Sequence, residues 1–184
     1  MPTIDDLRAA LTNTEKLLDR VENDQWSLPT PCAQWDVRAL VNHTTWVALA
    51  FTARTEGREL PAAGRDADVL GDAPARAFAD AAAASLAGWE RRGTDGTVSL
   101  PIGVLPAAAA LGIQTLDTYV HAWDLARATG QEDRFDTSLA DALLAFMMRV
   151  LPDPPRDGRF GPAVAVAADA PALDRLVAHT GRTP

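Results

Sequence analysis

The sequence contains very few of the residues that crosslink a chain or bind polyanions. Cys32 is the only cysteine, so no disulfide can form within the chain. Lys16 is the only lysine, and 17 basic residues face 25 acidic ones, which gives a net charge of −8. No cluster of basic residues interrupts this acidic balance. Such a chain is a poor candidate for binding nucleic acid or an anionic membrane, and we predict neither partner.

Long hydrophobic runs are also missing. The longest apolar stretch lies around residues 105–113, far short of the roughly 20 residues that span a bilayer. The first residues contain neither the basic region nor the apolar core of a secretory signal peptide. We therefore predict a cytoplasmic protein.

The apolar residues that are present favour helices. Hydrophobic residues make up 47% of the 184 residues, which is enough for one sizeable core, and most are Ala, Leu and Val. Apolar positions that recur every three to four residues predict four long helices. Their expected ranges are 3–23, 36–56, 74–93 and 106–129. Helices of about 20 residues are about 30 Å long and are typical of an up-down four-helix bundle, so we predict an all-α fold.

Shorter elements are expected around these helices. Residues 97–104 predict a small hairpin or an extended crossing, and 138–150 predict a fifth helix. In the remaining segment, 163–167 resemble a strand and 173–179 a short helix that folds back onto the body. We therefore divide the chain into a bundle, 1–152, and a C-terminal tail, 153–184.

The most informative pattern is a carboxylate and an imidazole four residues apart. Asp117 and His121 lie in the fourth predicted helix, where positions i and i+4 share one face. His43 lies on an otherwise apolar face of the second predicted helix. If these helices are neighbours, two histidines and one carboxylate form a three-ligand metal site with a position left for water or substrate. Each residue alone has an ordinary interpretation, as a core histidine or a helix carboxylate, and the set of three makes the metal hypothesis persuasive.

Two segments resemble a known family. Residues 29–43, Pro-Thr-Pro-Cys-Ala-Gln-Trp-Asp-Val-Arg-Ala-Leu-Val-Asn-His, are similar to the second-helix signature of the DinB-like superfamily. Residues 120–130, Val-His-Ala-Trp-Asp-Leu-Ala-Arg-Ala-Thr-Gly, resemble a second signature, that of the metal-binding domain of mycothiol-dependent maleylpyruvate isomerases. The tail resembles that of a short single-domain subfamily of metal-binding proteins.

The resemblance implies a four-helix bundle with a divalent metal, zinc or nickel, held by His43, Asp117 and His121. It also implies that the metal binds the thiol of mycothiol or a similar cofactor and that the protein isomerises a small electrophile or transfers sulfur to it. The chain departs from the isomerase by having Asp rather than Glu at position 117 and a short tail instead of a separate C-terminal domain. Dimers are common for this type of bundle.

Several side chains near the signatures have two interpretations. Asp124 could orient His121, or it could pair with Arg127 or Arg38 at the surface, and we favour the surface pair. The remaining candidates divide into aromatic residues that either line the pocket or belong to the core, and arginines that either bind an anion or are solvated. The aromatic residues are Trp35, Trp46 and Trp123, and the arginines are Arg38, Arg54 and Arg127. From these two sets we assign Arg38, Trp46 and Arg54 to cofactor binding.

Two further residues could take part in chemistry. Cys32 lies near the start of the second helix, where the helix dipole could lower its pKa and make it a nucleophile, although a structural role is the more common one. His179 could reach back as a fourth ligand, although a solvated histidine is more common.

Three functions remain open from the sequence. The first is a metal-dependent, thiol-using transferase or isomerase, which requires an open coordination position. The second is a bundle that binds a metal or small ligand without turnover. The third is a metal-dependent hydrolase, which requires a carboxylate base about one water away from the metal. We rank hydrolysis below transfer because neither helix signature contains an obvious base.

Overall fold

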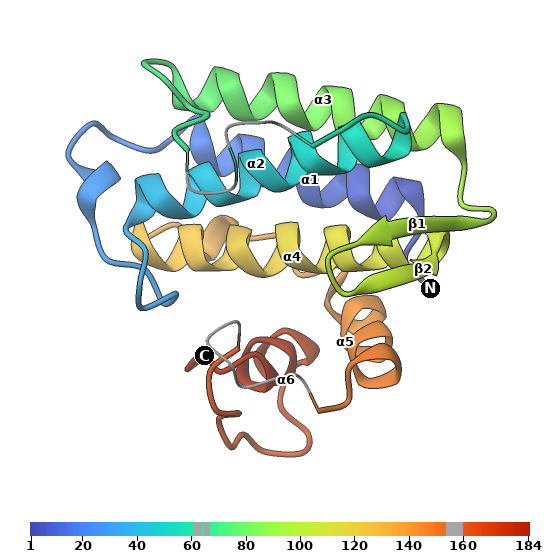
Figure 1. The fold of residues 1–184 in the computed structure, drawn as a ribbon. Coiled ribbons are helices and arrows are strands. Elements are labelled where there is room, and N and C mark those ends of the chain that lie inside the picture. Colours follow the sequence, from blue (N-terminus) through green and yellow to red (C-terminus); the bar gives the residue numbers. More distant parts are fainter. Residues whose placement is uncertain (61–63, 65–66, 154–159) are drawn as a thin grey trace.

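Four long helices form the body of the molecule in the computed structural model, which describes residues 1–60, 64, 67–153 and 160–184 (Figure 1). These helices are α1 (Ile4–Leu18), α2 (Val37–Thr55), α3 (Pro74–Arg92) and α4 (Ala107–Ala128). α1 and α2 each pack against both α3 and α4. Their shared core contains fully buried side chains from every helix, including Leu7, Leu40, Phe78, Trp89 and Leu111. The four predicted long helices are thus confirmed.

Local sequence signals set where these helices begin. Thr3 caps α1: its hydroxyl accepts from the Asp6 amide, and the Asp6 carboxylate accepts from the Thr3 amide. Asp36 caps α2 by accepting from the amide of Ala39 at 2.8 Å. Pro74 occupies the first turn of α3, where its missing amide hydrogen has no cost.

The end of α1 differs from the prediction. The helix stops at Leu18 rather than near residue 23, and a short 3₁₀ helix, η1 (Gln25–Ser27), follows. The amides of Arg20 and Val21 donate to carbonyls only three residues back, which tightens and closes the last turn. Residues 22–24 are exposed Glu, Asn and Asp, which have no apolar face to bury, and Asn and Asp favour turns over helix interiors.

A β-hairpin connects α3 to α4. Strands β1 (Thr97–Leu100) and β2 (Gly103–Pro106) pair antiparallel, with Leu100 opposite Gly103. Gly103 has a φ of 125°, which other residues rarely adopt, and this permits the tight turn. The hairpin alternative is confirmed, and the all-α prediction must be corrected to a helical fold with a small two-stranded sheet.

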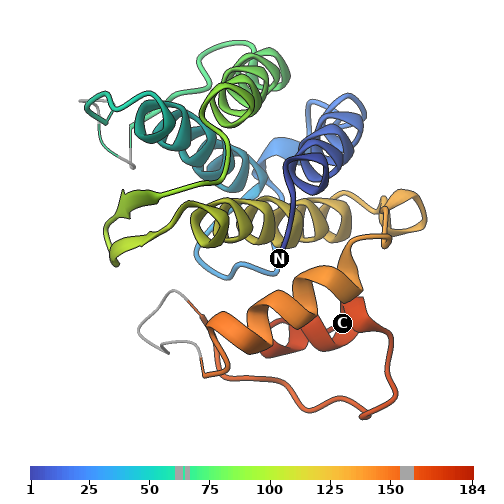
Figure 2. The same cartoon turned by 90° about the vertical axis from the view of Figure 1, so that its right-hand side faces the viewer.

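The C-terminal part packs beneath α4 (Figure 2). α5 (Ala140–Val150) contacts α4 and α6 (Ala172–His179), and the short 3₁₀ helix η2 (Glu132–Arg134) precedes α5. Val120, Phe146 and Leu176 belong to one buried cluster that joins the three helices. Both short helices are therefore confirmed. The predicted division at residue 152 lies beside residues 154–159, which are outside the described residues, and stays a prediction.

The strand-like prediction for residues 163–167 is wrong. This segment has no β-ladder, and the amide of Val164 instead donates to the carbonyl of Ala178 at the end of α6. Alternating Val and Ala suits a strand only where a second strand lies alongside, and here the neighbour is a helix end.

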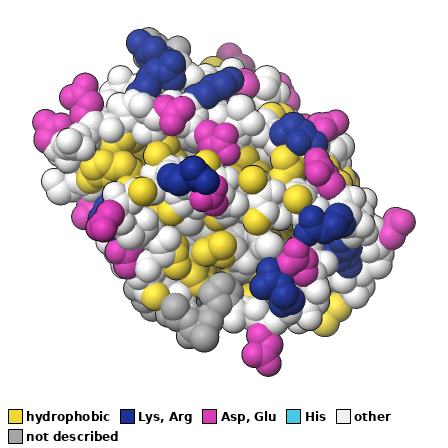
Figure 3. Space-filling view, turned by 90° about the horizontal axis from the view of Figure 1, so that it is seen from above, with side chains coloured by type: hydrophobic (Ala, Val, Ile, Leu, Met, Phe, Trp, Pro, Cys, Tyr) yellow, Lys and Arg dark blue, Asp and Glu magenta, His cyan; other side chains and the backbone are white. Residues whose placement is uncertain are grey.

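On the face seen in Figure 3, basic and acidic side chains are interspersed, and neither kind forms a large patch. Within α3, the exposed side chains of Arg76 and Asp80 form an ion pair at 2.8 Å. Within the described ranges, none of the helices combines the length and the apolar character needed to cross a membrane.

Candidate metal centre

Three side chains from α2 and α4 converge at one point. His43 Nε2 lies 3.5 Å from Asp117 Oδ1, and His121 Nε2 lies 3.7 Å from the same oxygen. The donor atoms of all three residues lie within 4.8 Å of one another. Asp117 and His121 occupy one face of α4 as their spacing predicts, and α4 packs directly against α2. The structure therefore brings together the three residues that the sequence nominates.

The cluster is largely enclosed but still reached by solvent. The exposed fractions of the side chains are 20% for His43, 29% for Asp117 and 10% for His121. Trp35 covers part of the cluster, with its ring centroid 4.5 Å from that of His43 and 5.5 Å from that of His121. An open side and an aromatic wall are what a site needs to admit one small ligand and exclude bulk water.

The loop before α2 places Trp35 on the histidines. The Trp35 amide donates to the Cys32 carbonyl at 2.8 Å, which closes a tight turn. The Trp35 carbonyl accepts from both the amide and the hydroxyl of Thr30, at 3.3 and 2.8 Å. A bridge between Pro29 and Asp36 then leads the chain into the cap of α2. The loop is thus held by its own hydrogen bonds.

Asp117 contributes an ionised carboxylate to the cluster. Burial raises the pKa of this carboxyl, but the nearby His43 and His121 lower it by more. The net pKa therefore lies below the usual value of an aspartate. Its second oxygen, Oδ2, is buried and has no hydrogen-bond partner among the described residues. A buried carboxylate oxygen without a donor is rare and marks a place where a cation fits.

Asp124 orients His121 and does not form the surface pair that we favoured. Its side chain is fully buried, and Oδ2 lies 2.9 Å from His121 Nδ1. Because an ionised carboxylate only accepts, Nδ1 carries the hydrogen of this bond, and Nε2 is the ring nitrogen on the Asp117 side, at 3.7 Å from Oδ1. Arg127 and Arg38 pair elsewhere, with Glu132 and Asp68, so the expected surface pair is wrong.

The counter-ion of Asp124 is Arg182, which sequence reasoning did not identify. Arg182 donates from Nε and Nη2 to the two oxygens of Asp124, at 2.9 and 2.6 Å. Burial raises the pKa of Asp124, but the hydrogen bonds from His121 and Arg182 lower it more, and the net pKa is below the usual value. A separation of 58 residues leaves no periodic signal that could have indicated this pair.

Comparison with known proteins identifies the family to which these residues belong. Residues 7–126 match the family described as the mycothiol maleylpyruvate isomerase N-terminal domain. The chain belongs to this family. The uncharacterized proteins MT0763 and Rv0738, from Mycobacterium tuberculosis strains CDC 1551 / Oshkosh and ATCC 25618 / H37Rv, are each 33% identical to it over 178 residues. These alignments cover 91% of this chain and 90% of each relative.

Solved structures of the mycothiol-dependent maleylpyruvate isomerase share the fold. The isomerase has a TM-score of 0.55 at 19% identity, and a mutant form of it has a TM-score of 0.56 at 18% identity. Each similarity covers 66% of this chain and 58% of the isomerase chain, so the match spans little more than half of the enzyme. The family resemblance read from the sequence is thus confirmed, and the helical architecture agrees with it.

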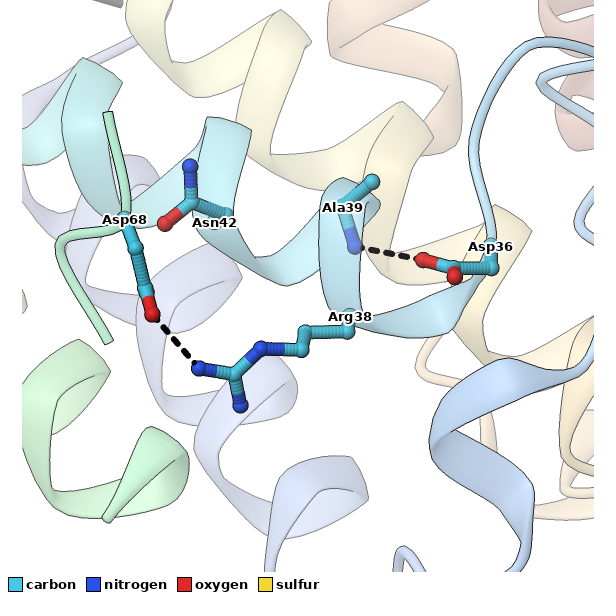
Figure 4. A pocket seen from close by; sticks show the side chains of 5 residues that line it. All are labelled: Asp36, Arg38, Ala39, Asn42 and Asp68. Carbon is cyan, nitrogen blue, oxygen red and sulfur yellow. Dashed lines mark hydrogen bonds and ion pairs between the residues drawn. The ribbon is translucent and has the colours of Figure 1, made fainter. Parts of the chain in front are cut away.

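A pocket of about 310 Å³ lies beside the first half of α2 in this family member (Figure 4). Asp36, Arg38, Ala39, Asn42 and Asp68 line it. Arg38 extends across it and donates to Asp68 at 2.8 Å and to the Gly71 carbonyl at 2.9 Å. Asn42, which precedes His43, is itself anchored by the Val69 amide. The pocket therefore lies between α2 and the segment before α3, contains the half-exposed Arg38 guanidinium, and is not lined by His43, Asp117 or His121.

The other residues assigned to cofactor binding lie further along α2. Trp46 follows His43 by one turn, and its indole N–H is buried without a partner among the described residues. Arg54 follows His43 by eleven residues, which is about 16 Å along the helix axis, and its guanidinium lies over the Phe51 ring. The structure thus places Arg38 against Asp68 and Gly71, Trp46 one turn along α2 from His43, and Arg54 further away, and the roles of all three stay predictions.

The remaining candidates have distinct surroundings. Cys32 lies near His121 and Asp124, with donor atoms within 4.8 Å, but burial raises the pKa of its thiol above the usual value. The Cys32 thiol therefore lacks the lowered pKa that its interpretation as a nucleophile requires, which agrees with the structural role. His179 Nε2 lies 3.4 Å from the Leu151 carbonyl, which places it between α6 and the end of α5 rather than in either cluster of donor atoms found among the described residues. Trp123 is buried, with Arg127 over its ring, which agrees with a core role.

Proposed function

We propose that His43, Asp117 and His121 hold one divalent metal ion, zinc or nickel, and that the protein uses it to bind a low-molecular-weight thiol. The observation that carries this proposal is the Asp117 carboxylate: its Oδ1 lies 3.5 and 3.7 Å from the Nε2 atoms of His43 and His121, and its buried Oδ2 has no hydrogen-bond partner among the described residues. Two nitrogens and one oxygen are a donor set that zinc and comparable metals accept, with a position left for an exogenous ligand. We also propose that α1–α4 form the up-down four-helix bundle that supports the site.

The charge balance of the site supports an anionic ligand. With both imidazoles neutral, Asp117 and Asp124 contribute two negative charges and Arg182 one positive charge, so the side chains carry one net negative charge. A divalent cation would change the total to one positive charge. A thiolate would neutralise it, which is favourable in a largely enclosed site.

When bound, the metal would lower the pKa of a coordinated thiol and keep its sulfur as a thiolate near neutral pH. The chain's own residues supply the other requirements. Trp35 excludes water from one side of the histidines, and Asp124 keeps the His121 hydrogen on Nδ1. Arg38 lines a pocket large enough for part of a polar cofactor, and the buried Trp46 N–H has no hydrogen-bond partner among the described residues. We assign cofactor contacts to these two residues, and a more distant one to Arg54.

Family membership supports mycothiol as the thiol and isomerisation or sulfur transfer to a small electrophile as the reaction. The two relatives that match over most of their length are described as uncharacterized, so they do not indicate which substrate is used.

Hydrolysis ranks lower because neither carboxylate that the described residues bring to the site is free to act as a base. Asp117 would be a ligand, and Asp124 is held by His121 on one side and Arg182 on the other. A fully buried carboxylate that binds a guanidinium and an imidazole in this way is a poor base for water.

Elemental analysis of protein purified without a histidine tag tests the proposal, with His43→Ala in parallel. We expect about one zinc or nickel per chain, lost in the variant, and then thiol-dependent turnover of electrophiles such as activated alkenes. Metal bound without thiol-dependent turnover would favour the non-catalytic binding bundle. Metal absent from the wild type, even after dialysis against zinc, would refute the metal centre.

A further inference from the structure

The segment after α6 turns back so that one arginine reaches the helix of the metal-ligand candidates. The Gly181 amide donates to the Ala178 carbonyl and the Arg182 amide to the Val177 carbonyl, both at 3.0 Å. This pair of bonds is the Schellman arrangement that ends a helix at a glycine. Gly181 has a φ of 92°, and a Cβ there would lie 2.6 Å from the Gly161 Cα, so no other residue fits. The turn therefore fixes where Arg182 begins.

Arg182 is buried and fully engaged. Its exposed fraction is only 8%. Nε and Nη2 bind both oxygens of Asp124, and Nη1 donates to the Thr180 carbonyl at 3.3 Å. The same Asp124 Oδ2 accepts from His121 Nδ1 at 2.9 Å. A continuous chain of hydrogen bonds thus runs from the C-terminal segment, through a fully buried carboxylate, to a predicted metal ligand.

A two-point grip on a carboxylate fixes its plane, which a single contact does not. The guanidinium is planar and its donors match the spacing of carboxylate oxygens. Without it, Asp124 would be a buried charge with one neutral donor, free to rotate away from His121. The imidazole could then place its hydrogen on Nε2, where it would block coordination of a cation.

We propose that Arg182 is a positioning residue of the metal centre: by holding both oxygens of Asp124, it sets the ring orientation and the Nδ1–H tautomer of His121. The expected effect of Arg182 on metal affinity rests on the proposed metal centre, whereas its effect on the His121 tautomer can be measured in metal-free protein. The residue lies outside the 7–126 segment that matches the family, so the C-terminal segment completes a site whose ligand candidates all come from the matched region.

The test compares full-length wild type, Arg182→Gln and Arg182→Lys, with Arg175→Gln as the matched control. Arg175 lies on the exposed side of the neighbouring α6, so its substitution removes the same charge from the same segment. The first measurement is the His121 tautomer in metal-free protein, from long-range proton–nitrogen NMR spectra assigned with His43→Ala and His179→Gln. The second is the zinc dissociation constant, from competition with a chelator.

We expect a pure Nδ1–H tautomer of His121 in wild type and Arg175→Gln, and a mixture in Arg182→Gln. Zinc affinity should fall about 10- to 100-fold in Arg182→Gln, the usual range for losing a partner behind a metal ligand. The zinc affinity of Arg182→Lys should lie between those of wild type and Arg182→Gln, because lysine keeps the positive charge but cannot bind both carboxylate oxygens in one plane. Circular dichroism checks that each variant is folded.

The outcomes separate this proposal from the proposed function. A folded Arg182→Gln with an unchanged His121 tautomer overturns the positioning role. If Arg182→Gln does not fold, Arg182→Lys and Asp124→Asn take its place, and an unchanged tautomer in both overturns the role equally. If wild type binds no zinc while the tautomer still depends on Arg182, the metal centre is wrong and the positioning role stands.

Discussion

Replacing Asp117 with Asn should remove most of the stabilisation that zinc gives to the protein. Asn has the same shape as Asp, so the helix and its packing are preserved, but its amide is neutral and one donor atom becomes an NH₂ group. In the metal-free protein the pKa of the Asp117 carboxyl lies below its usual value, so this side chain is ionised near neutral pH and offers a negatively charged oxygen to a cation. The variant lacks that charge.

The size of the effect follows from binding linkage. At free zinc equal to 100 times the wild-type dissociation constant, binding adds about 2.7 kcal/mol to the unfolding free energy. If the variant binds about 100-fold more weakly, the same zinc adds only about 0.4 kcal/mol. For 184 residues, the wild-type contribution corresponds to a rise in the melting temperature of about 7 °C, and that of the variant to about 1 °C.

The assay is thermal unfolding by circular dichroism with and without zinc, and the quantity compared is the zinc-dependent shift of each protein. Taking the difference removes any change in metal-free stability caused by the substitution. Asp80→Asn on α3 is the matched control, because Asp80 is 63% exposed and pairs only with Arg76 among the described residues. It should keep the full shift. A zinc shift in Asp117→Asn equal to that of wild type would refute the assignment of Asp117 as a ligand.

Two predictions concern the packing that supports the site. Gln114→Leu should destabilise the protein by about 2–4 kcal/mol in urea unfolding, because the Trp89 indole and the Ser85 hydroxyl lose their buried partner at 2.7 and 2.8 Å; a change below 1 kcal/mol would contradict this. Gly112→Ala should destabilise by about 1–2 kcal/mol although Ala favours helices, because the new Cβ would lie 2.5 Å from the buried Phe146 ring. A more stable Gly112→Ala would show that α5 shifts freely against α4.

Much of the fold could be predicted because its signals are local. A capping residue needs only its partner three positions away, as Thr3 and Asp6 show, and Pro74 marks a helix start without tertiary information. The error at 163–167 arises where the signal is not local. A strand exists only when another strand is adjacent, and the sequence does not state that the neighbour would be the end of α6.

The candidate site also combines residues that local spacing predicts with residues that it does not predict. Asp117 and His121 share a helix face, so their spacing alone brings them together, and His43 required one further assumption, that α2 and α4 are neighbours. The Trp35 wall depends on a loop turn closed by Cys32 and Thr30, which no periodic pattern predicts.

Asp124 shows why spacing fails where burial decides. His121 and Arg127 both lie three residues from it on the helix, one on each side, so geometry along the chain permits either partner. The structure separates them by exposure: Asp124 is fully buried, whereas the Arg127 side chain is 43% exposed. A buried carboxylate requires a counter-charge that is buried with it, and only a segment that covers the helix can supply one. Arg182 meets this condition, and the glycine turn at Gly181 is what allows it to do so.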